Sequence, residues 1–166
     1  MKNKWIVLAV VSATVIVSGF YFFYFLKAAP ATATQTVNDL PMLSITQVDG
    51  STVFLRDVQN KVVLIFFNPD CDHCQREAKL ISEQKQIFKN HLVYFISNDE
   101  MANIQKFAID YDLLDSNFHF ARAEGAEVYR VMGPMPSVPA IFIYDNYRLV
   151  KRLEGEVKLE EVMKYL

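Results

Sequence analysis

The chain has 166 residues, a formal net charge of −2 and only two cysteines. This charge balance lacks the basic excess with which proteins bind nucleic acids, so we expect no nucleic-acid partner. Two cysteines also exclude a framework of several disulfide bridges.

The first predicted element is a membrane-spanning helix. Residues 5–26 carry no charged side chain, and a helix of that length spans the hydrocarbon core of a bilayer. Two lysines precede this run and Lys27 alone follows it closely, which favours a cytoplasmic N-terminus at residues 1–4 and an extracytoplasmic remainder. A cleaved signal peptide is the alternative, because residues 31–33 have the small-residue spacing of a cleavage site. The apolar run is longer than the core of a signal peptide, which favours an uncleaved anchor.

A linker and a single globular domain follow the predicted anchor. Residues 27–41 are rich in Ala, Thr and Pro without an apolar period, which is typical of an extended tether. Residues 42–166 are numerous enough for one domain with its own core. The domain is predicted to begin with a β-hairpin over residues 43–48 and 52–56, because an Asp-Gly pair separates these two β-prone runs.

Strands and helices alternate through the middle of the domain. The apolar run 62–67 predicts a strand buried on both faces, and a helical pattern extends from residue 72 to about residue 90. Residues 92–96 predict the next buried strand, and Asp99 opens the helix after it. The remaining predicted elements are a short helix over 124–132, strands over 140–144 and 148–153, and a last helix from about residue 158.

This order predicts an α/β fold with a mixed central sheet flanked by helices. Alternating strands and helices favour parallel strands with right-handed crossovers, whereas the late strand pair shares a short turn and must be antiparallel. Phe118 and Phe120 are interpreted as core aromatics, and no strand is predicted around them.

The strongest chemical signal is Cys71-Asp72-His73-Cys74, at the junction of strand 62–67 and the following helix. Unpaired N–H groups and the positive end of the dipole at a helix start favour the thiolate of Cys71, the nucleophilic form in dithiol chemistry. Cys74 lies one turn further along the helix, near enough to close a disulfide. A zinc site is the alternative, but there is no other cysteine, and His91 and His119 are isolated in the sequence, at surface or strand-end positions.

With these motifs in order, residues 42–166 resemble the thioredoxin-like redoxins, and within them the membrane-anchored TlpA/ResA type. The resemblance is carried by the hairpin with its Asp-Gly turn, the strand leading into the C-x-x-C, Ser137-Val138-Pro139-Ala140 with the strand after it, and Gly155 before the last helix. It implies a thioredoxin-like fold with an N-terminal β-hairpin. It also implies a single-pass protein of the bacterial cell membrane, with its domain on the extracytoplasmic, periplasmic side.

The resemblance assigns roles to four residues near the cysteine motif. It implies that Cys71 is the exposed nucleophile and that Cys74 is the resolving thiol. It further implies that the bond between Val138 and Pro139 is cis, which leaves the Val138 backbone open to pair with an incoming substrate chain.

Glu77 matches a glutamate that proteins of the TlpA/ResA type carry three residues after the second cysteine. In this chain Glu77 also lies on the predicted inward stripe of its helix with Cys74. Desolvation there would raise the pKa of the Glu77 carboxyl, which could then exchange a proton with Cys74. The alternative is a solvated Glu77 paired with Arg76 or Lys85.

Three neighbours of the cysteines depart from thioredoxin's own motif and are expected to tune it. Thioredoxin has tryptophan before the first cysteine and Gly-Pro between the two, where this chain has Asp70 and then Asp72-His73. The histidine is expected to stabilise the thiolate, whereas the two aspartates oppose a further negative charge. These effects have opposite signs and similar size, so only the resemblance favours reduction over oxidation.

The sequence therefore predicts an extracytoplasmic thiol–disulfide oxidoreductase that reduces client proteins without a cofactor or metal. We expect a monomer, held in the membrane lipid by its N-terminal helix and re-reduced by a membrane electron donor. Two alternatives stay open. A thiol peroxidase would carry Thr or Ser three residues before its reactive cysteine, where Asn68 stands. A Cu(I)-binding protein could use the thiols with Met132, Met135 and His73.

Overall fold

The computed structural model describes residues 4, 17–21, 39–135 and 137–166. Most of the predicted membrane span 5–26 and of the linker 27–41 lies outside these ranges, although residues 17–21 are helical. Among the described residues, no helix has the length and apolar character needed to cross a membrane.

The chain divides into two units, residues 1–34 and 35–166, and the second unit contains one seven-stranded sheet in its described part. In sheet order the strands are β2 (Thr52–Phe54), β1 (Ser44–Gln47), β5 (Phe118–Arg122), β4 (His91–Ser97), β3 (Lys61–Phe66), β6 (Ala140–Asp145) and β7 (Arg148–Glu154). Strand β4 is parallel to both of its neighbours, β3 and β5, and the other neighbouring pairs are antiparallel. The mixed sheet and the N-terminal hairpin are therefore confirmed.

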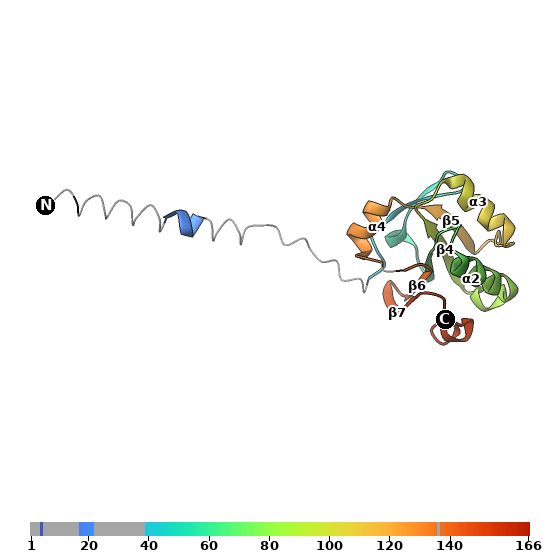
Figure 1. Cartoon of the computed structure of the whole chain (residues 1–166). Helices are drawn as coiled ribbons and strands as arrows, with labels where there is room; N and C mark the ends of the chain where they lie inside the picture. The colour runs from blue at the N-terminus through green and yellow to red at the C-terminus, as the bar shows by residue number, and fades with distance from the viewer. Residues whose placement is uncertain (1–3, 5–16, 22–38, 136) are drawn as a thin grey trace. The chain divides into compact units, whose positions relative to one another are not determined.

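The helices of this unit are α2 (Asp72–Glu83), α3 (Met101–Asp110), α4 (Gly125–Met132) and α5 (Leu159–Met163), with short 3-10 helices η1 (Leu55–Asp57) and η2 (Lys85–Phe88). They cover both faces of the sheet, as Figure 1 shows for α2 and α3 on one side and α4 on the other.

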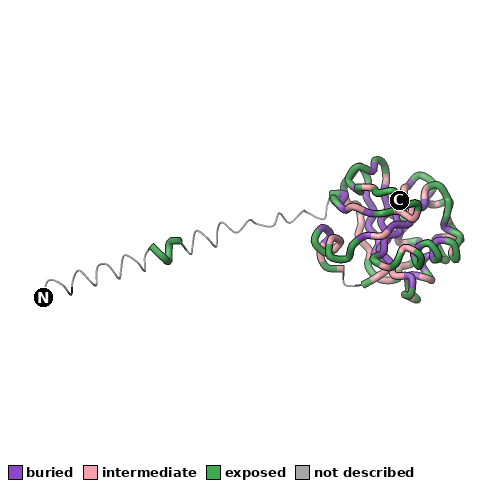
Figure 2. Tube along the Cα trace, turned by 90° about the horizontal axis from the view of Figure 1, so that it is seen from above, coloured by how far each residue is buried: buried purple, intermediate pink, exposed green. Residues whose placement is uncertain are grey.

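Alternate residues of β3 face the two sides of the sheet. Val63 and Ile65 lie in a first core with α2, α3 and α5, while Leu64 lies in a second core with α4 and the hairpin. Burial on both faces explains the continuous apolar run of β3, and Figure 2 shows the buried chain inside an exposed shell.

Strand β5 was not predicted, so the predicted order of elements is wrong between α3 and α4. Phe118 and Phe120 are buried in the first core, as expected, but they alternate with the half-buried His119 along a strand. The strand pairs in parallel with β4 and antiparallel with β1, so it joins the hairpin to the rest of the sheet.

The predicted helix from residue 72 to about residue 90 is also corrected, because it ends at Glu83. Gln84 leaves helical geometry, with φ −129° and ψ 32°, and the 3-10 helix η2 then brings Phe88 fully into the first core. Lys85 begins this 3-10 helix, and its ammonium lies 2.8 Å from carboxylates of Asp112 and Asp115.

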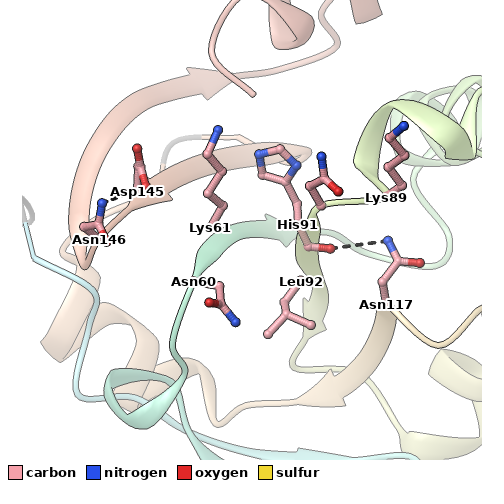
Figure 3. Close-up of a pocket in the computed structure, with 9 residues that line it drawn as sticks. Asn60, Lys61, Lys89, His91, Leu92, Asn117, Asp145 and Asn146 are labelled. Atoms are coloured by element: carbon pink, nitrogen blue, oxygen red, sulfur yellow. Dashed lines mark hydrogen bonds between the residues drawn. The ribbon is translucent and has the colours of Figure 1, made fainter.

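His91, expected at the surface or at a strand end, begins β4 but is buried, with 6% of its surface exposed. Within the described part of the chain, neither ring nitrogen has a hydrogen-bond partner. It lines a polar pocket at the start of β3 and β4, where Figure 3 shows it beside Lys61. Desolvation first, and then the Lys61 charge, lower the pKa of His91, so the folded protein favours a neutral imidazole.

We expect His91→Leu to stabilise the fold by about 1 kcal/mol at pH 7.5, because it removes a buried polar group without a partner. The gain should be larger at pH 5.5. Because the pKa of His91 is lower in the folded state, the wild type loses stability as pH falls below the unfolded value of 6.5. Urea unfolding at both pH values measures this. A less stable variant, or equal pH dependence in both proteins, would contradict it.

Candidate functional site

The two cysteines lie at the end of the parallel strands where β3 ends and α2 begins. The Phe67 N–H donates to the Ile96 carbonyl at 3.0 Å, which extends the β3–β4 contact by one residue. A turn follows, in which the Asn68 side-chain oxygen accepts from the Asp70 N–H at 2.7 Å and the Asn68 carbonyl accepts from the Cys71 N–H at 3.1 Å. This turn leaves Cys71 as the N-cap residue of α2.

The two thiols are both free and differ in exposure. Cys71 is half-buried, whereas Cys74 has only 3% of its surface exposed. Burial is the main cause that raises the pKa of Cys74 to about 12; a hydrogen bond with the Cys71 side chain adds to it, while the Asn68 backbone opposes it. The geometry thus distinguishes an accessible thiol from a buried thiol that needs an acceptor for its proton.

The loop before β6 supplies the second wall of the site. The Val138–Pro139 bond is cis, as the resemblance implied. The Cys71 thiol donates to the Val138 carbonyl, with 3.7 Å between sulfur and oxygen. Residues 71 and 138 therefore face each other across the site, although 67 positions separate them in the chain.

Glu77 is buried one turn beyond Cys74, with 3% of its surface exposed. Neither carboxylate oxygen has a hydrogen-bond partner among the residues that the structure describes. Desolvation, followed by the negative charge of Glu156, raises its pKa to about 8; the Val157 backbone weakly opposes this shift. The alternative of a solvated Glu77 paired with Arg76 or Lys85 is therefore wrong. Both of these cations pair with other carboxylates.

Asp70, Asp72 and His73 are exposed around the accessible thiol. Of these, His73 contacts a residue that the sequence did not indicate: its Nδ1 lies 2.6 Å from the Glu156 carboxylate, in the loop between β7 and α5. Arg76 binds the same carboxylate. In the loop between β7 and α5, the resemblance had pointed only to Gly155, which has a positive φ of 73°.

We expect Gly155→Ala to destabilise the fold by about 1 kcal/mol, because alanine is strained at a positive φ. The Gly155 N–H donates to the Pro139 carbonyl at 2.8 Å, so this residue also ties the β7–α5 loop to the cis-proline loop. Thermal unfolding measures the effect. Gly155→Asn is the matched control and should cost less, since asparagine tolerates this conformation; equal losses would contradict the assignment.

The methionines of the copper alternative pack in a different core from the thiols. Met132 is buried in the second core and Met135 packs against it, whereas Cys74 belongs to the first core and Cys71 packs there. Among the described residues, no group of three or more His, Cys, Asp or Glu side chains is arranged to hold a metal ion. The structure therefore does not bring this proposed copper-ligand set together.

Comparisons with known proteins agree with the fold. The family model described as AhpC/TSA matches residues 36–152, and no curated protein sequence matches the chain. A secreted Mycobacterium tuberculosis disulfide oxidoreductase homologous to E. coli DsbE is 21% identical, with a TM-score of 0.63 over 75% of this chain and 93% of that one.

Two further solved structures share the architecture. M. tuberculosis DsbF is 20% identical, with a TM-score of 0.64 over 75% of this chain and 92% of that one. A thioredoxin-like protein from Porphyromonas gingivalis is 26% identical, with a TM-score of 0.59 over 76% and 88%. The predicted thioredoxin-like fold is thereby confirmed, and family and fold agree with the expected class of thiol–disulfide oxidoreductase.

Proposed function

The chain belongs to the AhpC/TSA family, and from this premise and its site geometry we propose that it reduces disulfides in client proteins. The observation that carries the proposal is the pair of free thiols, one accessible beside the Val138 carbonyl and one buried behind it. A nucleophile must reach a disulfide in another protein, whereas a resolving thiol needs only to reach the nucleophile. Cys71 and Cys74 have these respective positions.

The reaction proceeds by two thiol–disulfide exchanges. The Cys71 thiolate attacks one sulfur of the client disulfide, forming a mixed disulfide and releasing the first client thiolate. The Cys74 thiolate then attacks the Cys71 sulfur and releases the second client thiolate. Two electrons pass to the client, which ends as a dithiol once its sulfurs are protonated, while the protein ends with a Cys71–Cys74 disulfide.

Glu77 is proposed to accept the proton that Cys74 must lose in the second exchange. A thiol with a pKa of about 12 is almost wholly protonated at neutral pH and is a poor nucleophile until it loses its proton. A carboxyl with a pKa of about 8 is poised near working pH and lies on the same helix. Glu77 could return this proton to Cys74 when the disulfide is reduced again.

Membrane attachment completes the proposal. We propose that residues 5–26 anchor the chain in a bacterial membrane and hold the redox domain outside the cytoplasm, supported by the uncharged run and the lysines before it. A client peptide would pair with the Val138 backbone, and a membrane electron donor would reduce the disulfide again. The TlpA/ResA type of redoxin fits this arrangement, with the protein acting as a monomer.

A catalytic assay tests the proposed activity. The full-length protein in detergent should accelerate the reduction of insulin disulfides by dithiothreitol, because its dithiol passes electrons between the two. No acceleration over dithiothreitol alone would overturn the proposal.

The peroxidase alternative receives less support from the site. The position three residues before Cys71 is Asn68, whose side-chain oxygen accepts from the Asp70 N–H and so caps the turn. Rapid peroxide turnover with a sulfenate at Cys71 would favour this alternative over disulfide reduction.

A further inference from the structure

Glu156 joins two segments that flank the cysteines. Its Oε1 accepts from the Arg76 Nε at 3.0 Å and its Oε2 accepts from the Arg76 Nη2 at 2.8 Å, a bidentate contact across 80 positions of the sequence. Oε2 also lies 2.6 Å from the His73 Nδ1. Both partners stand on the first turns of α2, and His73 is one of the two residues between the cysteines.

Glu156, Arg76 and His73 form a polar network, and the His73 ring can take part in it in two ways. Its Nδ1 lies 2.6 Å from the Glu156 carboxylate and 2.7 Å from the Arg76 Nη2. A carboxylate only accepts and a guanidinium only donates, so Nδ1 either donates to Glu156 or accepts from Arg76. Glu156 is an anion at neutral pH, because hydrogen bonds from Arg76 and then His73 lower its pKa to about 2.

Charges of the network act on the reacting groups. The Glu156 carboxylate is the second largest cause, after burial, of the raised pKa of Glu77. The Arg76 guanidinium in turn interacts electrostatically with Cys71 and Asp72. One ion pair thus presents its negative member to the buried carboxyl and its positive member to the nucleophile.

On the basis of the proposed function, we propose that Glu156 is a positioning residue for the dithiol: it holds Arg76 and His73 beside Cys71 and offsets the positive charge of Arg76. A cation near the cysteines stabilises the thiolate and hence the reduced protein, whereas an anion does the opposite. Glu156 therefore keeps the dithiol more reducing than it would be beside an unpaired Arg76. A residue outside the C-x-x-C motif thus tunes the reduction potential of the dithiol.

The test measures the equilibrium between the full-length protein and glutathione at pH 7, with the oxidised fraction read by thiol alkylation. Glu156→Gln keeps the shape but removes the charge, and should raise the equilibrium constant for reducing the protein disulfide about threefold. Arg76→Gln leaves the anion unpaired and should lower the constant by a similar factor. Glu156→Asp retains the charge and should lie closer to wild type than Glu156→Gln.

Opposite signs separate electrostatic positioning from a purely structural clamp, since loss of a clamp would affect both variants alike. Asp110→Asn is the matched control: it removes an exposed pair with Lys106 at the end of α3, and should leave the constant unchanged. The proposal is wrong if both variants shift in the same direction, or if neither shifts more than Asp110→Asn. That result would leave the proposed reductase intact, because insulin reduction by the wild-type protein tests the reductase separately.

Discussion

Full-length protein carrying Cys71→Ser will reduce insulin disulfides no faster than dithiothreitol alone. A hydroxyl cannot form the mixed disulfide, and Cys74 cannot replace the nucleophile because it is buried and its pKa is raised to about 12. We expect turnover to fall by about a thousandfold or more, as for loss of a covalent nucleophile in other enzymes. The initial rate of insulin precipitation measures this loss.

Cys74→Ser is the matched control, because it changes the same atom type three residues away. This variant keeps the accessible nucleophile but cannot resolve the intermediate, so it should accumulate a mixed disulfide between Cys71 and the client. Non-reducing gels and mass spectrometry identify the adduct. An adduct that formed on Cys74 in the Cys71→Ser protein would reverse the assigned roles.

Replacement of Glu77 is expected to slow catalysis and stabilise the fold at the same time. Glu77→Gln removes the proton acceptor for Cys74, and general acid–base groups of this kind contribute about a hundredfold or more. Stopped-flow mixing of reduced protein with an excess of a small disulfide separates the formation of the mixed disulfide from its resolution. The resolution step should be slowed in the variant, and the formation step should be nearly unchanged.

The stability gain has a defined pH dependence. The pKa of Glu77 rises from 4.5 to about 8 on folding, so the wild type loses stability as pH increases from the lower value towards the higher one. Glu77→Gln does not titrate, and its stability relative to wild type should increase by about 2 kcal/mol between pH 5 and pH 7. Urea unfolding at the two pH values measures the difference.

Glu83→Gln is the control for this pair of effects, because it makes the same chemical change at an exposed position of α2. It should alter neither resolution nor the pH dependence of stability. If Glu77→Gln behaved like Glu83→Gln, the buried carboxyl would have no part in the reaction.

Local patterns in the sequence were sufficient for much of this fold. The Asp-Gly turn predicted the hairpin β1–β2, and the apolar run from Val62 predicted β3, because turn chemistry and burial act over a few residues. The position of Cys71 at the start of α2 followed from the same strand-to-helix junction. The inward stripe of α2 predicted that Glu77 faces the core with Cys74, and both are buried.

Strand β5 could not be predicted in the same way. Phe118 and Phe120 lie on one face with only His119 between them, and so short a run fits a strand or a loop with two core aromatics. The strand is stabilised by parallel pairing with β4 and antiparallel pairing with β1, which are contacts between distant parts of the chain. Its identity follows from tertiary structure.

Glu156 was missed for the same physical reason. In the sequence it is one of many exposed acidic residues, and nothing adjacent links it to His73 or Arg76. The topology returns β7 beside β6, so the loop after β7 reaches the first turns of α2. A positive φ at Gly155 bends the chain where this contact begins.

The central claim is that Cys71 and Cys74 act together as one reversible two-electron couple. This claim is tested directly by equilibrating the full-length protein with mixtures of oxidised and reduced glutathione. Free thiols are then alkylated, and mass spectrometry counts the alkyl groups on each molecule. We predict two species, with both cysteines alkylated or neither, and a single transition with a two-electron slope. Singly alkylated protein through the transition, or two cysteines that stay alkylated in every mixture, would contradict the account.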